Sequence, residues 1–446
     1  MLAVLPASMI AAHAREPGAE EAPPPGQVVQ SATAPAALDM HGAIDAALSW
    51  HPRIRDALGS FQQYGDYVDV ARAGYLPQVR AGLNTEQGNR EIAGYDSRRL
   101  HRFTMTVSQM LYDFGKVSSE VDLAQAQRAS EQAGVLLAID DVAREAAQAW
   151  IEVDRQKTLL EIAREQSHGI TAIADLVRER HARGAAPLSD EMQARSREEA
   201  ARANEVEAEA QLQRWRTRLQ LLTRTRALPE TAGEPAAELQ GACAAGEARL
   251  PPPQVLMAQA QQLAAQADVR RVRAGSLPTL SLDGSVSRGL DDASRQYGDY
   301  DGTVMLNLSG PLYEGGGNRA RQRAAGHGLT AADAALERAR LDARQSLQDA
   351  RLRASGYQAR ERLLAGRTDS IEQTRGLYRQ QYLDLGTRSL LDLLNAEQEY
   401  QLARLDAANN RYELQRVQVD CLYASGRMRE AFASDPAQLE PLETFR

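Results

Sequence analysis

The feature that most constrains the fold of this chain is an internal duplication. RAGYLPQV begins at Arg72 and returns as RAGSLPTL after 201 positions, and LYDFGK at Leu111 returns as LYEGGG after the same distance. A third echo relates GAAPLSDEMQA at Gly184 to GTRSLLDLLNA at Gly386, with an offset of 202. Self-similarity at a fixed spacing means that one structural unit occurs more than once. The chain is therefore predicted to consist of two related halves.

Long stretches without proline predict long helices. No proline occurs between Pro77 and Pro187 or between Pro311 and Pro436, and Ala, Leu, Glu, Gln and Arg dominate both stretches. A helix over residues 116–183 alone would span about 100 Å, so no single globular core could bury it. Such a rod must lie along other helices, as in a coiled coil or an extended bundle. The same pattern predicts helices over residues 189–225, 318–384 and 387–427.

Each half also carries two segments in which apolar and polar residues alternate. This alternation is typical of strands, so we predict one β-hairpin over about 77–112 and another over about 278–313. One face of the predicted strands is polar, with Thr104, Thr106 and Asp283 among its residues. The opposite face is apolar and is predicted to contact lipid. Its lipid-facing residues are Phe103, Met105, Val107, Leu280, Leu282, Val304, Leu306 and Leu308.

Strands that are apolar on one face and polar on the other, at this length, are typical of the wall of a transmembrane β-barrel. An ordinary soluble hairpin is the alternative, but the rest of the sequence predicts no other sheet for it to pack on. Four strands are too few to close a barrel within one chain, and open sheet edges cannot face lipid. Several copies of the chain must then share one barrel.

Composition and motifs argue against several function classes. The net charge of -8 gives no support for a nucleic-acid surface, and no run of 18 apolar residues predicts a transmembrane helix. GGGNRA at Gly315 matches a dinucleotide-binding fingerprint, but a helix is predicted to continue where that fingerprint needs a second strand. The seven histidines form no catalytic constellation. We predict no enzymatic activity, no cofactor and no metal.

The N-terminal segment and the two cysteines leave alternatives open. Residues 1–14 are apolar and end in Ala-His-Ala, which resembles an export signal cleaved after Ala14; a disordered tail is the alternative. A Pro-rich linker follows over 15–37. Cys243 and Cys421 are too few for a disulfide framework and lack zinc spacing. We expect Cys421 to be a small packed side chain, and whether it meets Cys243 is open.

Several motifs, taken together and found twice, resemble those of the TolC family of outer-membrane channel proteins. They are Leu-Pro opening a hairpin, LYDFG or PLYEGG closing it, and long helices broken at Gly184 and at LGTRSLLDLLNAE. The resemblance extends from about Leu38 to Met428. It implies a mainly α fold with a transmembrane β part, in which three chains form a 12-stranded β-barrel that continues into a 12-helix periplasmic α-barrel. The junctions between strand and helix would lie at Pro77, Tyr112, Gly115, Pro311, Tyr313 and Gly316.

The predicted organisation follows from the duplication and the resemblance. One departure from the family pattern is Met110, where members commonly have a proline, as at Pro311 in the second half. The resemblance implies a mixed equatorial belt, expected near Ala227–Pro253 and the C-terminal tail. The predicted segments are a signal peptide (1–14), a disordered linker (15–37), a first repeat (38–226), an equatorial linker (227–253), a second repeat (254–428) and a C-terminal tail (429–446). Each repeat is predicted to consist of a helix, then a β-hairpin, then long helices.

The resemblance also implies a gate at the periplasmic entrance. Arg388 would be the basic residue that links to an acid on a neighbouring helix. Asp190, together with Ser189, would lie on the partner side of this link in the other repeat, and Asp392 would be an acidic residue that faces the pore. Asn395 stands where the best-known member has a second acid, so the acidic ring should hold cations less strongly. Tyr382 could belong to the same link, although it lies one position further from Gly386 than expected. The alternative for Arg388 and Asp190 is an ordinary surface pair worth well under about 1 kcal/mol. The tips at Gly184 and Gly386 resemble the places where periplasmic adaptor proteins dock.

The function implied by the resemblance is a passive exit duct in the outer membrane of a Gram-negative bacterium. Its partners would be two further copies of the chain, outer-membrane lipid, a periplasmic adaptor (membrane fusion) protein and an inner-membrane ABC or proton-driven transporter. Because no cysteine that could carry a lipid lies near the N-terminus, we expect type I protein secretion. The alternatives are a multidrug efflux pump and, in another class, a soluble periplasmic coiled-coil scaffold.

Overall fold

The structure is a computed structural model. It describes residues 38–86, 91–92, 95–96, 100–244, 246, 250–290 and 300–432. The predicted signal peptide, the linker over 15–37 and residues 433–446 of the predicted tail lie outside the described residues.

The described elements follow the predicted alternation of long helices and hairpins. The helices are α1 (Met40–Leu48), α2 (Pro52–Arg72), α3 (Lys116–Ala182), α4 (Leu188–Thr223), α5 (Pro253–Gly275), α7 (Gly317–Gln380), α8 (Leu390–Ala424) and α9 (Met428–Phe432). The strands are β1 (Gln78–Glu86), β2 (Glu91–Ile92), β3 (Tyr95–Asp96), β4 (Leu100–Tyr112), β5 (Thr279–Gly289) and β6 (Asp301–Ser309). The short turns are η1 (Ala73–Tyr75) and η2 (Ala237–Leu239), both 3₁₀, and the π-helical η3 (Gln381–Leu385).

The four predicted long helices correspond to α3, α4, α7 and α8, with ends that differ by a few residues. Two local features were not predicted. The helical stretch before the first hairpin is divided into α1 and α2, because Pro52 disfavours a helical conformation at His51 (φ -58°, ψ 131°). The long α7 does not stay α-helical to Asp384 but ends in the π-helical turn η3.

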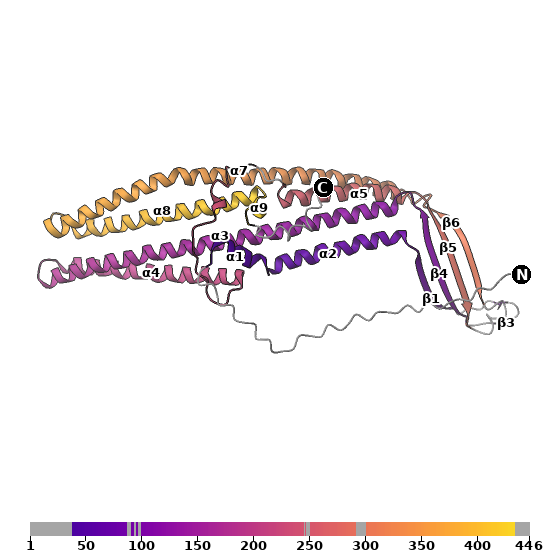
Figure 1. Ribbon diagram of the computed structural model, residues 1–446, viewed down its shortest axis with the longest axis horizontal. Coiled ribbons are helices and arrows are strands. Elements are labelled where there is room, and N and C mark those ends of the chain that lie inside the picture. Colours follow the sequence, from indigo (N-terminus) through magenta and orange to yellow (C-terminus); the bar gives the residue numbers. More distant parts are fainter. Residues whose placement is uncertain are drawn as a thin grey trace. The chain divides into compact units, whose positions relative to one another are not determined.

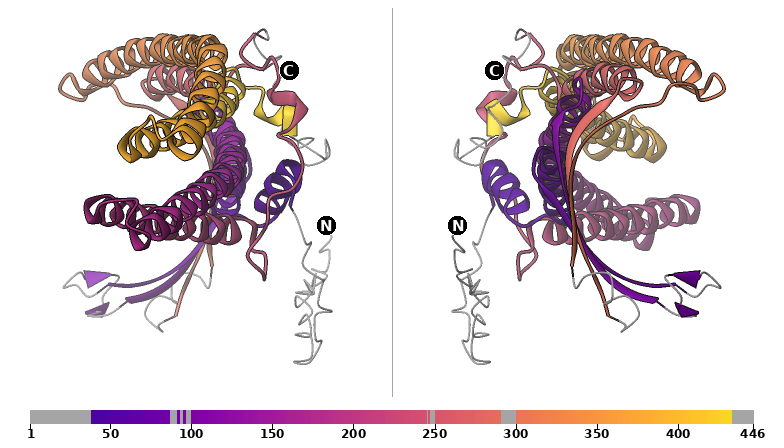
Figure 2. Two further views of the ribbon diagram at one scale, coloured as in Figure 1. Left: turned by 90° about the vertical axis from the view of Figure 1, so that its left-hand side faces the viewer. Right: turned by 90° about the vertical axis from the view of Figure 1, so that its right-hand side faces the viewer.

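The long helices lie side by side in a curved layer, which is seen along the helix axes in Figure 2. On the side of the sheet, the order of contacts across the layer is α2, α3, α5 and α7; on the side away from it, the order is α4, α3, α8 and α7. The two longest helices, α3 and α7, therefore run through both sides. Each of the other two places in the layer is filled by two shorter helices, one place by α2 and α4 and the other by α5 and α8 (Figure 1). In the described part, no helix is both long enough and apolar enough to cross a membrane.

The largest core lies in the middle of the helical layer. It is centred on Trp150 of α3, which is fully buried and whose indole N–H donates to the carbonyl of Leu38 at 2.8 Å. Alanines such as Ala43, Ala146 and Ala147 are also fully buried there, and such small side chains let helix axes approach closely. The core joins α1, α3, α4, α7 and α8 to η2 and α9.

A disulfide joins Cys243, which follows η2, to Cys421 near the end of α8. The expectation that Cys421 is only a small packed side chain was therefore incomplete: it is fully buried, and it is also covalently bonded. The two Cα atoms are 5.1 Å apart although 178 positions separate the residues in sequence. The bond attaches the segment between the two repeats to the second repeat.

The four long strands form one antiparallel sheet with the order β1-β4-β5-β6. Each repeat supplies one hairpin, and the hairpins pair through β4 and β5, where Thr106 lies opposite Ser285. A separate two-stranded ribbon, β2-β3, lies within the first hairpin's loop and was not predicted. Strands β1 and β6 are the two edges of this sheet: β1 pairs only with β4 and β6 only with β5 among the described strands, so the outer side of each edge strand has no partner strand there.

Candidate functional site

The strand register places all eight predicted lipid-facing residues on one face of the sheet. Val107 of β4 lies opposite Gly284 of β5, which in turn lies opposite Val304 of β6. Because residues alternate between faces, this alignment forms a continuous apolar row across the strands. Residues of this face are well exposed, with 79% of Val304 and 64% of Leu306 accessible. Contact of this face with lipid stays a prediction.

The opposite face of the sheet is polar and is tied together by side-chain hydrogen bonds. Asp283 of β5 accepts from the hydroxyl of Ser108 on β4 at 2.5 Å and from that of Ser281 at 2.9 Å. One step along the same face, the hydroxyl oxygens of Ser285 and Thr303 are 2.7 Å apart. The bond between Ser108 and Asp283 connects the two hairpins across the polar face, and the bond between Ser285 and Thr303 connects the two strands of the second hairpin. This face would line the inside of a shared barrel.

The junctions between strand and helix have the same backbone geometry in both repeats. Phe114 and Gly115 have left-handed φ angles of 57° and 90°, and Gly315 and Gly316 have 61° and 87°. In the first repeat, the Asp113 carboxylate accepts from the backbone N–H of Gly115 at 2.9 Å and of Val117 at 2.6 Å, which caps the start of α3. The glycines of GGGNRA thus serve the turn from strand to helix, as the predicted junctions at Gly115 and Gly316 required.

The predicted junction residues Pro77 and Pro311 lie beside the strand ends, next to β1 and just beyond β6. The tyrosines of the two closing motifs are exposed, Tyr112 by 58% and Tyr313 by 87%. Aromatic side chains in this position, between an apolar sheet face and a helical region, match the aromatic girdle of outer-membrane barrels.

The two predicted tips are tight turns at the ends of α3 and α7. Gly184 has φ +72° and Gly386 has φ +63°, a left-handed conformation that favours glycine. Beyond Gly386, Ser389 caps α8: its hydroxyl accepts from the N–H of Asp392 at 3.2 Å. The Asp392 carboxylate accepts from the hydroxyl and the N–H of Ser389 in return, at 2.9 and 3.4 Å. The predicted pore acid is thus also part of a capping box.

Within one chain, the predicted base Arg388 contacts residues of its own hairpin. Its Nε donates to Oε1 of Gln381 at 3.0 Å, and its guanidinium carbon lies 4.4 Å from the centroid of the Tyr378 ring. The carboxylate of Asp392 lies 3.9 Å from its terminal nitrogen. No interaction between Arg388 and Asp190 is present among the described residues of one chain.

A different set of residues joins the two tips. Tyr382 of η3 is 7% exposed and packs in a cluster with Val177 of α3 and Leu393 of α8. Arg180 of α3 lies over its ring, 5.0 Å from the centroid, and donates to its carbonyl at 3.4 Å. Burial raises the pKa of Tyr382, Arg180 opposes this rise, and Asp190 adds to it. The structure thus brings Asp190 into the electrostatic environment of Tyr382.

Arg180 is a tip residue that sequence reasoning missed. It stands four positions before Gly184, as Tyr382 stands four positions before Gly386. The offset of 202 that relates the glycines therefore also relates Arg180 to Tyr382, and this was the available signal. Of the other predicted gate residues, the Ser189 hydroxyl lies 3.5 Å from a carboxylate oxygen of Asp190, and Asn395 is exposed.

Comparison with known proteins identifies the family. The sequence profile described as "Outer membrane efflux protein" matches residues 43–223 and 244–426. The chain is 24% identical over 408 residues to the outer membrane protein TolC of Salmonella enteritidis, covering 85% of this chain and 80% of that protein. It is 32% identical over 174 residues to the proteases secretion protein PrtF of Dickeya chrysanthemi, covering 36% of each.

A solved structure has the same fold. The crystal structure of a membrane protein from Pseudomonas aeruginosa aligns with a TM-score of 0.76 and 23% identity, covering 86% of this chain and 90% of that one. The family profile covers both repeats, including the sheet and both tips. The chain belongs to the outer membrane efflux protein family, and it is accordingly a channel protein of the outer membrane rather than an enzyme.

Proposed function

We propose that three copies of this chain form a closed duct through the outer membrane. The sheet order leaves β1 and β6 as unpaired edges, and an unpaired edge in lipid leaves costly backbone groups without partners. Like the sheet, the helical layer has two margins: α2 and α4 lie at one margin and α7 lies at the other. Pairing the β6–α7 margin of one copy with the β1–α2–α4 margin of the next is a head-to-tail contact, which closes into a ring.

The duct takes its cargo from an inner-membrane transporter through a periplasmic adaptor. The tips at Gly184 and Gly386 are the ends of the helical layer farthest from the sheet (Figure 1). They carry exposed apolar side chains, such as Leu188 (57% exposed) and Leu385 (64%), which suit a protein contact. The adaptor docks on these tips, and the energy for transport comes from the inner-membrane partner.

The gate at these tips works between neighbouring copies. Since Arg388 reaches residues of its own hairpin within one chain, its link to Asp190 and Ser189 must be made to the adjacent copy. Asp392 and Asn395 then face the pore, where the single acid holds cations weakly. Three such surface pairs, at about 0.5–1 kcal/mol each, favour the closed state by a few kcal/mol. A docking adaptor with higher affinity for the open state can overcome this difference.

The cargo is a protein exported by type I secretion. The observation that carries this assignment is the 32% identity with PrtF, a proteases secretion protein. The second candidate, a multidrug efflux pump, is favoured by the description of the family as efflux proteins.

Deletion of the gene in its source bacterium, followed by complementation, distinguishes the two cargoes. We expect loss of one or more proteins from the culture medium and their recovery on complementation, with unchanged susceptibility to hydrophobic drugs. Drug hypersensitivity with an unaltered set of secreted proteins would replace secretion by efflux. The trimer is tested by light scattering in detergent, where a well-folded pore with the mass of a single chain would refute the shared barrel.

A further inference from the structure

The second repeat has one residue more than the first between its strand–helix junction and its tip. Gly184 lies 69 positions after Gly115, whereas Gly386 lies 70 positions after Gly316. The offset between the repeats is therefore 201 at the junctions and 202 at the tips. The additional residue lies within the stretch that α7 and η3 occupy in the second repeat and that α3 occupies in the first.

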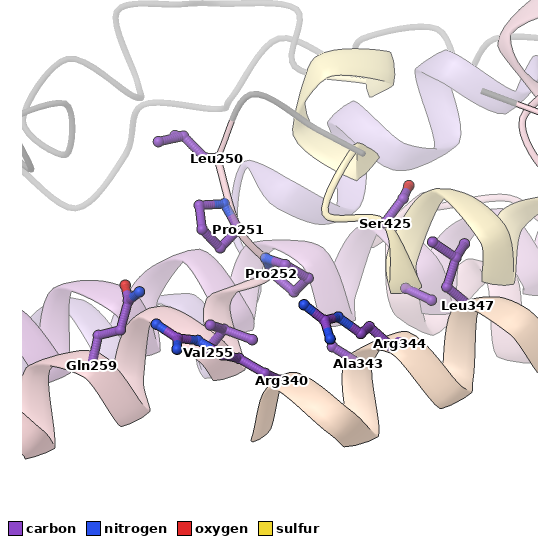
Figure 3. A pocket seen from close by; sticks show the side chains of 11 residues that line it. Leu250, Pro251, Pro252, Val255, Gln259, Arg340, Ala343, Arg344, Leu347 and Ser425 are labelled. Carbon is purple, nitrogen blue, oxygen red and sulfur yellow. The ribbon is translucent and has the colours of Figure 1, made fainter. Parts of the chain in front are cut away.

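A difference between the repeats at the middle of the helical layer, by contrast, leaves the residue count unchanged. Helix α5 begins at Pro253, 201 positions after Pro52, where α2 begins. The residues before α5, Pro251 and Pro252, line a pocket of about 330 Å³ (Figure 3). Because the offset is still 201 here, the additional residue of the second repeat has no part in this pocket.

The π-helical turn η3 contains the additional residue. Helices α3 and α7 are α-helical along their whole lengths. From Gly316 to Gly386, the turn Gln381–Leu385 is the part that departs from the α-helical pattern of the first repeat. A π-helical turn closes hydrogen bonds from residue i to residue i+5, so it takes one residue more than an α-helical turn. The N–H of Gly386 accordingly donates to the carbonyl of Gln381, five positions before it.

The tip of the first repeat has no such turn, and its backbone bonds the last carbonyls of α3 within the tip itself. The N–H of Gly184 donates to the carbonyl of His181 at 2.8 Å, and the N–H of Ala185 donates to that of Arg180 at 2.7 Å. This pair of bonds is the Schellman motif at a helix C-terminus. At the offset of 201, the position that corresponds to His181 is Tyr382.

In the second repeat, the additional residue leaves the carbonyl of Tyr382 to another donor. The N–H groups of Gly386 and Thr387 both donate to the carbonyl of Gln381. The carbonyl of Tyr382 accepts from Nη1 of Arg180 at 3.4 Å, and the Arg180 guanidinium lies 5.0 Å from the centroid of the Tyr382 ring. Since Arg180 belongs to α3, a carbonyl that the tip backbone does not use becomes a contact between the two hairpins.

This contact differs from an exposed surface pair because its acceptor is shielded from water. Tyr382 is buried as a whole residue, and a buried backbone carbonyl without a donor costs free energy. Arg180 supplies the donor from the other hairpin. The guanidinium and the ring face add a cation–π interaction.

We propose that the additional residue of the second repeat is what lets Arg180 hold the tip of the α7–α8 hairpin against α3. Without it, the N–H of Gly386 closes onto the carbonyl of Tyr382, as Gly184 closes onto His181, and Arg180 loses its acceptor. Because Arg388 follows η3 directly, the link also fixes the position of the gate, a consequence that rests on the proposed function.

Deletion of Asp384 tests the role of the additional residue in the full-length protein. Asp384 is an exposed residue within η3, and its deletion gives the second repeat the same residue count as the first. The matched control is Asp384→Ala, which removes the same charge and keeps the count.

A second pair of variants tests the link from the side of α3. Arg180→Met removes the guanidinium and keeps most of the apolar stem. Its control is Arg183→Met, because Arg183 lies in the same turn and pairs with Glu179 of its own helix. All variants are compared with the parent by amide hydrogen exchange in detergent, followed by mass spectrometry of peptides from both tips, and by single-channel conductance in planar bilayers.

We expect the deletion and Arg180→Met each to raise the exchange rate at both tips by about two- to fivefold. Their combination should exceed neither, because both remove one link, and the two controls should exchange like the parent. Conductance should rise in the same two variants. Faster exchange with unchanged conductance would remove the gate from the proposed function and leave the link in place.

Three results would overturn the link. They are equal exchange in the deletion and Asp384→Ala, equal exchange in Arg180→Met and Arg183→Met, and additive effects of the deletion and Arg180→Met. Helical circular dichroism shows whether the deletion variant folds; if it does not, the comparison of Arg180→Met with Arg183→Met decides alone.

Discussion

Removal of the disulfide between Cys243 and Cys421 is predicted to lower the thermal stability of the channel substantially. The bond closes a loop of 178 residues, which contains most of the second repeat. In the chain-entropy description, constraining a loop of this length in the unfolded state is worth about 5 kcal/mol per chain. The expected loss is larger than that of a typical core substitution, because the loop is long.

The temperature shift follows from the size of the chain. An unfolding entropy of about 2.1 cal/mol/K per residue gives about 0.9 kcal/mol/K for 446 residues. A loss of about 5 kcal/mol then lowers the melting temperature by about 5–6 °C. The measurement is the loss of helical circular dichroism on heating, for the parent and for variants with Cys243→Ala, Cys421→Ala or both.

The pattern among the variants separates the bond from local packing. Either single substitution breaks the disulfide, so each should cause nearly the whole shift and the double variant should add little. Cys421→Ala also removes a fully buried sulfur, which should make it slightly the more destabilising of the two. Melting of the double variant within 1 °C of the parent, or additive effects of the two single changes, would refute the reasoning.

Three further predictions concern the membrane face, the gate and a buried acid. Leu306→Arg should cost about 2–4 kcal/mol at mid-membrane and reduce assembly in the outer membrane, whereas Met305→Arg, on the polar face of the same strand, should assemble normally; equal assembly of both would show that the faces are assigned wrongly. Arg388→Ser should raise single-channel conductance in planar bilayers, and Asp190→Ala should raise it as well. Because both residues belong to one link, the variant with both substitutions should conduct no better than either single variant. Unchanged conductance would leave these residues as ordinary surface charges. Burial raises the pKa of Asp140 from 3.8 to about 7, against the opposing charge of Arg429 and with Asp141 adding to the rise, so the folded protein retains a proton that the unfolded chain loses. That stabilisation is complete below the unfolded pKa and is lost as the pH rises through about 7. The urea concentration at the midpoint of unfolding should therefore decrease as the pH rises from about 4 to about 7 and level off above that; the same pH dependence in Asp140→Asn would contradict the assignment.

The sequence alone determined the elements and the architecture that they require. Helix and strand patterns are local, since they depend on periods of 3.6 and 2 residues. The duplication was visible because similar sequence motifs recur at offsets of 201 and 202 residues. The long helices, the two hairpins and the apolar sheet face could therefore be placed before the structure. The need for several chains followed from the same pattern, because four strands leave two edges that cannot face lipid.

The tertiary structure decided which distant residues meet. The pairing of Cys243 with Cys421 and the placement of Arg180 over Tyr382 join positions 178 and 202 residues apart. Such contacts depend on the axial register and rotation of long helices, which are set by the packing of many small side chains together. A shift of a single residue moves a side chain by about 100° around the helix and by 1.5 Å along it, so no local pattern could show that Arg388 contacts its own hairpin.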